Sequence, residues 1–331
     1  MRVLVTGATG FVGKNLVRHL LRHEYEVAIL ARRTSNLSGL PVDAIDVRWG
    51  DITDPAAVRN AMDGTEAVFH MAALVKEWVP RNQLFWEVNV DALETLLRAS
   101  MEFSLDRVVY TSSFMAIGPS DGLEEADETT THSPNHFCTL YERTKYEAAV
   151  VAERFVKIGA PVVTVCPGVI YGPGDLTEGN IMVRHLRDFL TDRLPGIPGD
   201  GSQRWCFSYV DDVVSGHRLA MEKGKVGERY ILGGENAALR DFFSIAMELT
   251  GKDKPPRQVP FPLLEAAAAL GQVKAAITRR PPTVALGAVR AYKHNWAYSS
   301  RKSIAELGYT VTPLRDGVTR TIDWLKNERM I

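Results

Sequence analysis

The chain has 331 residues, of which 45% are hydrophobic and 24% are charged, and its formal net charge is -1. This length and apolar content allow a well-packed core, which excludes a disordered polymer. The near balance of 39 basic and 40 acidic side chains excludes a protein that binds nucleic acid through a strongly basic surface. Length alone predicts two domains, or one large domain with a smaller annex.

The three cysteines, Cys138, Cys166 and Cys206, lie far apart in the sequence. None belongs to a Cys/His cluster with the spacing of a zinc site, so we expect no metal and reduced thiols. The first residues are typical of a strand and not of a signal peptide. No apolar run approaches the ~20 residues that span a bilayer. We therefore expect a cytoplasmic protein without a membrane span.

The first half of the chain alternates short β-rich runs with segments of helical periodicity. Helices are predicted between the strands, and the two longest cover residues 83–103 and 140–157. Strands separated by helices, without tight hairpins, indicate right-handed βαβ crossovers and a mostly parallel, doubly wound sheet. The predicted strands cover residues 3–5, 26–31, 42–50, 67–71, 107–111 and 161–166.

After about residue 168 this alternation ends, because Gly and Pro are concentrated in residues 167–175 and 195–201. A strand over 230–232 and helices near 239–250 and 263–277 follow. The sequence predicts an α/β fold with a dinucleotide-binding Rossmann domain and a smaller C-terminal α/β cap that binds substrate. We expect the first domain in residues 1–170 and the cap in 171–331, with about 205–222 returning to the first domain.

A glycine-rich segment, residues 6–13, follows the first strand and opens the first helix. Gly7 allows the tight turn, Gly10 lets the backbone approach a pyrophosphate, and Gly13 lets helix and sheet pack closely. The helix N-terminus supplies free N–H groups and the positive end of its dipole. A strand–turn–helix context of this kind predicts a dinucleotide site, and the alternative is a glycine-rich turn without a ligand.

The residues at the end of the second strand indicate whether the cofactor is NAD or NADP. NAD sites place an acidic residue there for the ribose 2′-OH, whereas this chain has Arg32 and Arg33. Arginine suits a 2′-phosphate, so NADP is favoured and NAD is possible. The alternative is a solvated basic loop beside an NAD site. Asp51, after the third strand, is placed to accept from the adenine amino group or to cap the next helix.

Tyr141 and Lys145 lie four residues apart on a predicted helix and so share one face. A free tyrosine has a pKa of ~10, but a neighbouring ammonium and a cationic nicotinamide would both favour the phenolate. Ser113 follows the fifth strand, at the sheet edge where open α/β sheets bind ligands. Its hydroxyl would hold a substrate oxygen while Tyr141 moves the proton. The alternative is an ordinary surface pair.

Together these motifs resemble the extended short-chain dehydrogenases/reductases over nearly the whole chain. The resemblance also rests on His70-Met71-Ala72-Ala73, on Asn89 and on residues 167–174. Within the superfamily the sequence is most similar to the dihydroflavonol-reductase-like branch. Residues 140–145, 167–174, 207–212 and 227–235 are most similar to plant farnesol dehydrogenase-type proteins.

The resemblance implies an enzyme whose catalytic residues are Ser113, Tyr141 and Lys145. It implies a homodimer formed through the two long helices. Arg32 occupies the position where NADP-using relatives bind the 2′-phosphate, but farnesol-type relatives use NAD, which leaves the cofactor open. The cofactor-binding positions that it implies are Gly7, Thr9, Gly10, Phe11, Val12, Gly13, Arg32, Asp51, Ile52, Ala72, Ala73, Leu74, Asn89, Pro167, Val169 and Ile170.

The candidate substrate residues Phe114, Met115, Met182 and Trp205 are apolar. Such a lining suits a prenyl or aromatic alcohol, or its aldehyde or ketone; the alternative is that these residues form interface core. A second candidate function is a nucleotide-sugar epimerase or dehydratase with tightly bound NAD. A third is a non-catalytic NAD(P)-sensing protein, against which the complete Ser-Tyr-Lys set argues. The arginines available for a sugar diphosphate are Arg184, Arg187, Arg193 and Arg204.

Overall fold

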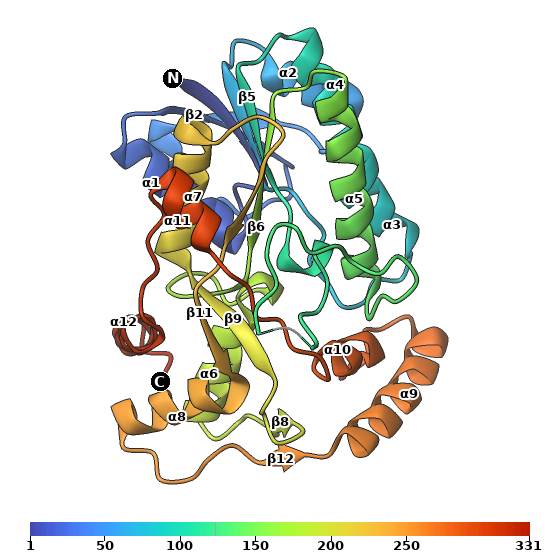
Figure 1. Cartoon of the computed structure of the whole chain (residues 1–331), viewed down its shortest axis with the longest axis vertical. Coiled ribbons are helices and arrows are strands. Elements are labelled where there is room, and N and C mark those ends of the chain that lie inside the picture. Colours follow the sequence, from blue (N-terminus) through green and yellow to red (C-terminus); the bar gives the residue numbers. More distant parts are fainter. Residues whose placement is uncertain (123) are drawn as a thin grey trace.

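The computed structural model describes residues 1–122 and 124–331. Its centre is a seven-stranded sheet with the order β10-β6-β5-β4-β1-β2-β3, in which every neighbouring pair is parallel (Figure 1). The predicted doubly wound parallel sheet is therefore confirmed. The strands are β1 (Arg2–Thr6), β2 (Glu26–Ala31), β3 (Asp46–Trp49), β4 (Ala67–His70), β5 (Arg107–Thr111), β6 (Val162–Pro167) and β10 (Arg229–Leu232).

Helices cover both faces of this sheet (Figure 1), so its strands are buried on both sides and read as continuous apolar runs. Each face has its own hydrophobic core. One face is covered by α1 (Phe11–Arg22), α7 (Val210–Lys223) and α11 (Arg301–Leu307), and the other by α2 (Pro55–Met62), α4 (Ala92–Glu102) and α5 (Leu140–Lys157).

The helix expected over 83–103 contains an irregularity. It consists of α3 (Gln83–Trp86), a π-helical turn over Glu87–Asp91, and α4. A π-turn inserts an extra residue into the helical ladder and turns the local side chains to a new direction, often at a functional site. Here it contains Asn89, whose side chain leaves the helix to bond a neighbouring loop.

A third hydrophobic core lies below the large sheet and is rich in aromatic rings, among them Tyr171, Phe207, Phe242 and Trp296. It surrounds a small sheet of order β11-β9-β7. The elements of this part are β7 (Val169–Tyr171), α6 (Ile181–Leu190), β8 (Ile197–Pro198), β9 (Arg204–Tyr209), β11 (Glu235–Ala238), α8 (Leu239–Thr250), β12 (Gln258–Val259), α9 (Phe261–Thr278), α10 (Leu286–Ala291) and α12 (Leu314–Asn327), with short helical turns at Val42–Ala44, Phe114–Ala116 and Glu178–Asn180.

The two halves of the chain exchange elements, so a division at residue 170 stays a prediction. Within the segment 205–222, α7 packs against α1, β5 and β6, whereas β9 lies in the small sheet. The strand expected at 230–232 is β10, and it forms an edge of the large sheet rather than part of a cap. Among residues 1–122 and 124–331, every helix is too short or too polar to cross a membrane.

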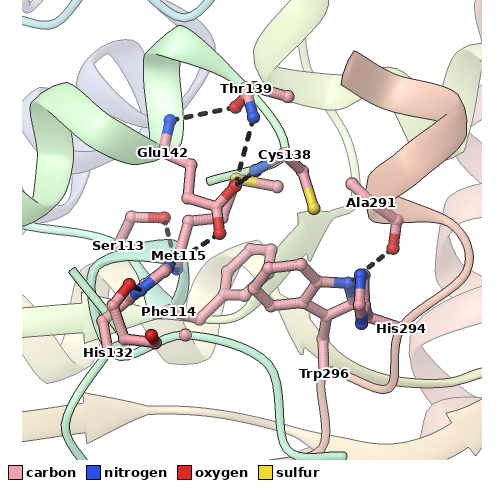
Figure 2. A network of polar contacts seen from close by, with 12 residues as sticks. Ser113, Phe114, Met115, His132, Cys138, Thr139, Glu142, Ala291, His294 and Trp296 are labelled. Atoms are coloured by element: carbon pink, nitrogen blue, oxygen red, sulfur yellow. Dashed lines mark hydrogen bonds and ion pairs between the residues drawn. The ribbon is translucent and has the colours of Figure 1, made fainter. Parts of the chain in front are cut away.

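A buried polar network fixes the start of α5 (Figure 2). The Thr139 hydroxyl accepts from the Glu142 backbone N–H (3.0 Å), and the Glu142 carboxylate accepts from the N–H groups of Thr139 (3.2 Å) and Cys138 (2.6 Å). This reciprocal arrangement is a capping box. The second carboxylate oxygen contacts Nε2 of His132 at 2.8 Å, and both side chains are about 1% exposed. The pair therefore ties the helix start to the preceding loop.

We predict that His132→Ala lowers the free energy of unfolding by about 1–3 kcal/mol, because it leaves the Glu142 carboxylate buried without one of its partners. Urea denaturation measures the change. The matched control is His294→Ala, which removes the half-exposed ion pair between His294 and Asp121 and costs at most about 1 kcal/mol. Equal losses in the two variants would contradict a special role for the buried pair.

Candidate active site

The turn between β1 and α1 is built for close backbone approach. Gly7 has a φ of +72°, and a Cβ there would lie 2.7 Å from the backbone N of Ala72. A Cβ on Gly13 would lie 2.2 Å from the carbonyl oxygen of Gly7. Gly10 precedes α1 and has no side chain to cap it, so the first-turn N–H groups are available to an anion. The glycine positions therefore fit a dinucleotide pyrophosphate.

Next to this turn, Thr6 links the ends of β1 and β4. Its hydroxyl accepts from the Ala72 N–H (3.2 Å) and lies 2.9 Å from Nδ1 of His70. Burial, with a smaller contribution from Lys145, lowers the pKa of His70 to about 3. His70 is therefore neutral at physiological pH, and its Nδ1 shares a hydrogen bond with the Thr6 hydroxyl. This network holds the loop that contains the predicted cofactor residues Ala72 and Ala73.

Asn89 joins that loop to α5. Its Oδ1 accepts from the Leu74 N–H at 2.7 Å, and its Nδ2 donates to the Thr144 hydroxyl at 3.0 Å. Thr144 lies on α5 between Tyr141 and Lys145, and its hydroxyl also donates to the Tyr141 carbonyl (3.0 Å). Sequence analysis missed Thr144, because a lone threonine within a helix carries no pattern. The bridge fixes the distance between the expected cofactor path and the expected catalytic helix.

Lys145, Tyr141 and Ser113 meet beyond the carboxyl end of β5. The Lys145 ammonium donates to the Thr111 carbonyl at 2.8 Å and lies 6.0 Å from the centre of the Tyr141 ring. Ser113 lies two residues after the end of β5 and caps the short helical turn at Phe114–Ala116, where its hydroxyl accepts from the Met115 N–H (3.2 Å; Figure 2). The Ser113 side chain also interacts with that of Tyr141, which opposes part of the rise that burial causes in the pKa of the phenol. The three side chains expected to act together are thus adjacent.

Burial decides the charge states of this trio. It raises the pKa of Tyr141 to about 12, and the hydrogen bond with Ser113 offsets only part of that rise. It lowers the pKa of Lys145 to about 8. The expectation that the neighbouring ammonium favours the phenolate is therefore outweighed by desolvation in the protein alone. At neutral pH the phenol keeps its proton and the amine keeps its charge.

The basic residues after β2 differ in their surroundings. Both arginines are exposed, but the Arg33 guanidinium lies 5.7 Å from the centre of the Trp49 ring, a cation–π arrangement. Asp51 accepts from the N–H (3.0 Å) and the hydroxyl (2.8 Å) of Thr53 and precedes Ile52. The alternative that Asp51 caps the next helix is wrong, because Asp54 caps α2 by accepting from Ala56 N–H.

Three of the four candidate substrate residues, Phe114, Met182 and Trp205, are buried in one apolar cluster, and Met115 packs against it. The Phe114 ring meets Trp205 edge to face, with centroids 6.4 Å apart. The indole N–H of Trp205 is buried and has no hydrogen-bond acceptor within the described part of the chain. An unpaired buried donor is costly, so an acceptor on a ligand would be favoured there.

The remaining predicted positions are also placed. Pro167 ends β6, and Val169 and Ile170 begin β7, so they lie where the chain passes from the large sheet to the small one. Thr9, Phe11 and Val12 belong to the glycine turn and the first turn of α1.

Elsewhere, a groove of about 850 Å³ runs beside α5 and β10, lined by side chains of both charges and by none of the predicted site residues.

Comparison with known proteins places the chain in a family. Residues 3–233 match the NAD dependent epimerase/dehydratase family. A putative dihydroflavonol 4-reductase from Synechocystis sp. is 32% identical, covering 98% of this chain and 94% of the relative. Sterol demethylase protein B from Methylococcus capsulatus is 33% identical over the full length of both chains. The crystal structure of gox2253 superposes with a TM-score of 0.84 at 33% identity, covering 99% of both chains.

The family match spans the glycine turn, the Ser-Tyr-Lys trio and the β6–β7 passage. The full-length relatives extend the likeness through the small sheet and the C-terminal helices. The chain therefore belongs to the NAD dependent epimerase/dehydratase family of extended short-chain dehydrogenases/reductases, with dihydroflavonol-4-reductase-like and sterol-demethylase-like relatives.

Proposed function

We propose that this protein is an NAD(P)-dependent reductase/dehydrogenase that interconverts a hydrophobic alcohol, of prenyl or aromatic type, with its aldehyde or ketone. The observation that carries the proposal is that Ser113, whose hydroxyl interacts with Tyr141, immediately precedes Phe114 of the aromatic cluster that also contains Trp205. A carbonyl held by the two hydroxyls would have its apolar remainder against these rings, which is the arrangement expected of an apolar substrate.

The bound nicotinamide would supply the hydride, and the side chains described above supply position and proton transfer. Gly7, Gly10 and Gly13 would hold the pyrophosphate. In reduction, Ser113 donates a hydrogen bond to the substrate oxygen, and Tyr141 gives that oxygen its proton. The Lys145 ammonium, held by the Thr111 carbonyl, stabilises the phenolate that remains. Oxidation of the alcohol reverses these steps.

The second candidate, a nucleotide-sugar epimerase or dehydratase, needs cationic groups for a diphosphate. Of the arginines considered for that task, Arg184 lies near Glu77 and Tyr292. Burial raises the pKa of both groups, and the charge of Arg184 opposes part of that rise. The other three are bonded to the protein itself: Arg187 to Asp188 (2.6 Å), Arg193 to Thr191 (3.0 Å) and Arg204 to the Glu124 carbonyl (3.3 Å). This engagement favours the hydrophobic substrate. Retention of NAD through purification would favour the epimerase.

The homodimer through the helices around 83–103 and 140–157 also stays a proposal. It is supported by the side-by-side packing of α4 and α5 and by apolar side chains that this region leaves exposed. Val150 and Phe103 are examples, at 44% and 38% exposure. The non-catalytic NAD(P)-sensing alternative has no observation in its favour beyond the dinucleotide site itself.

A panel of prenyl, aryl and sterol alcohols and carbonyls, assayed with both nicotinamides by reduced-cofactor absorbance, tests the function. We expect turnover of at least one apolar substrate. Tyr141→Phe should lower kcat by about 10²–10⁴-fold, because it removes the proton donor, while cofactor binding remains. The control is Tyr146→Phe, on the same helix. Conversion of a nucleotide sugar without turnover of any panel member would reverse the ranking, and full activity in Tyr141→Phe would refute the assigned acid.

Carbonyl reduction should lose rate as the pH rises through about 8, the lowered pKa of Lys145, because the neutral amine no longer stabilises the phenolate. Below that pH both groups hold their protons and kcat/KM should be flat. The measurement is kcat/KM for reduction against pH. In Lys145→Arg the residual activity should keep its plateau to higher pH, since arginine stays charged. A decline at the same pH in that variant would contradict the assignment.

Arg32, the first residue after β2, stands where NAD sites place an acidic residue, which supports a preference for NADP over NAD. Arg32→Ser should raise the KM for NADPH about 10–100-fold, the loss of a charge-assisted bond to the 2′-phosphate, and leave the KM for NADH unchanged. Arg33→Ser is the matched control, because Arg33 stacks on Trp49. Steady-state kinetics with each cofactor measures the effect. An equal change for both cofactors would point to a solvated loop beside an NAD site.

A further inference from the structure

Helix α9 presents large apolar side chains to solvent. Leu263, Leu270, Val273 and Ile277 are 58%, 74%, 62% and 79% exposed. The helix lies at the outer edge of the molecule beside α10 (Figure 1). Single exposed apolar residues are ordinary on a protein surface, but a continuous apolar patch marks an interaction site.

These side chains form one stripe along the helix. With Ala266, they recur at intervals of three or four residues, so they share a face. The buried residues of α9, Ala268 and Ala275, fall on the opposite side by the same spacing. The helix is therefore apolar both where it packs on α10 and where it faces water. Packing against α10 explains why the buried face is apolar, but it does not explain why the exposed face is apolar.

The surroundings of the stripe are basic. Residues 254–280 contain five basic side chains and one acidic one, in a chain whose net charge is -1. The acidic group, Glu265, is paired with Lys293 at 2.6 Å. The five basic side chains, all exposed, are Lys254, Arg257, Lys274, Arg279 and Arg280. Their positive charge is complementary to an anionic surface.

The apolar stripe could be covered by a second copy of this protein or by a membrane surface. An 18-residue helix is about 27 Å long, and one stripe along it offers far less than the ~800 Å² per partner of a stable protein interface. A second copy would also bring like charges together. The exposed face of α9 is apolar, with Lys274 within the helix and the other four basic residues before or after it. Apolar side chains of this kind enter a membrane interface, and neighbouring Lys and Arg attract anionic lipids.

We propose that α9 docks this protein on the surface of anionic bilayers, with the stripe in the interface and the five basic side chains against lipid phosphates. The docked helix would lie close to the candidate site. It packs on α10, where a Cβ on Gly287 would lie 2.7 Å from the Cys138 carbonyl, next to the start of α5. A substrate dissolved in the bilayer would then reach the candidate site directly, an interpretation that rests on the proposed function.

Flotation of the full-length protein with lipid vesicles tests the proposal. Vesicles of phosphatidylcholine alone are compared with vesicles that also contain phosphatidylglycerol. We expect flotation with the anionic vesicles, weakened by salt, and loss of it in the double variant Leu270→Glu/Ile277→Glu. The matched control is Ile304→Glu, an exposed residue on α11, which should float as the wild type does. Arg279→Gln/Arg280→Gln should weaken partition about fivefold per charge removed.

The proposal is overturned if the wild type does not float with anionic vesicles, or if Leu270→Glu/Ile277→Glu floats as well as the wild type. A dimer by light scattering that this double variant alone disrupts would assign the stripe to a second copy and overturn it as well. Turnover of a water-soluble carbonyl should be unchanged in the double variant. Vesicle binding is measured without substrate, so failure of the proposed reaction would not affect it.

Discussion

Desolvation sets the charge of the polar groups that gather at the ends of β1, β4 and β5. Burial keeps His70 neutral, keeps the proton on Tyr141, and brings the pKa of Lys145 down to about 8. The Thr111 carbonyl, which accepts from the Lys145 ammonium, then helps to hold a charge that its surroundings disfavour. In the proposed reaction Tyr141 would therefore begin as a proton donor, the role that carbonyl reduction requires of it.

Such a site needs a rigid α5, and three polar contacts provide it. Glu142 ties its first turn to His132, Asn89 reaches Thr144 from the π-helical turn, and Lys145 is fixed to the end of β5. Each contact joins α5 to a different element of the fold. Tyr141 immediately precedes the segment 142–145 that these contacts fix, so they hold the backbone from which its side chain extends.

Sequence reasoning succeeded where the signal is local. The glycine turn, the strand–helix alternation and the Tyr141/Lys145 spacing each lie within a few residues, and each depends on backbone geometry. It failed for contacts that a loop brings together, as with the buried pair of His132 and Glu142, which are ten residues apart. The Thr139-x-x-Glu142 capping box beside that pair is a local sequence pattern.

The charge state of Tyr141 could not be predicted from the sequence, for a related reason. A residue pair shows that an amine is near, but only the fold shows how much water is removed. The large sheet illustrates the same limit. Its pattern was visible up to β6, but nothing local indicates that β10 returns from the second half to pair with it.

That late strand has a consequence for biosynthesis. β10 is the last element to join the large sheet, and it covers β6, which is otherwise an edge. While the ribosome is still making residues beyond β6, the nascent Rossmann half has unpaired backbone groups along that strand, the kind of edge that recruits other chains. Truncation before Arg229 would leave β6 as an uncovered edge, and we expect such a fragment to aggregate.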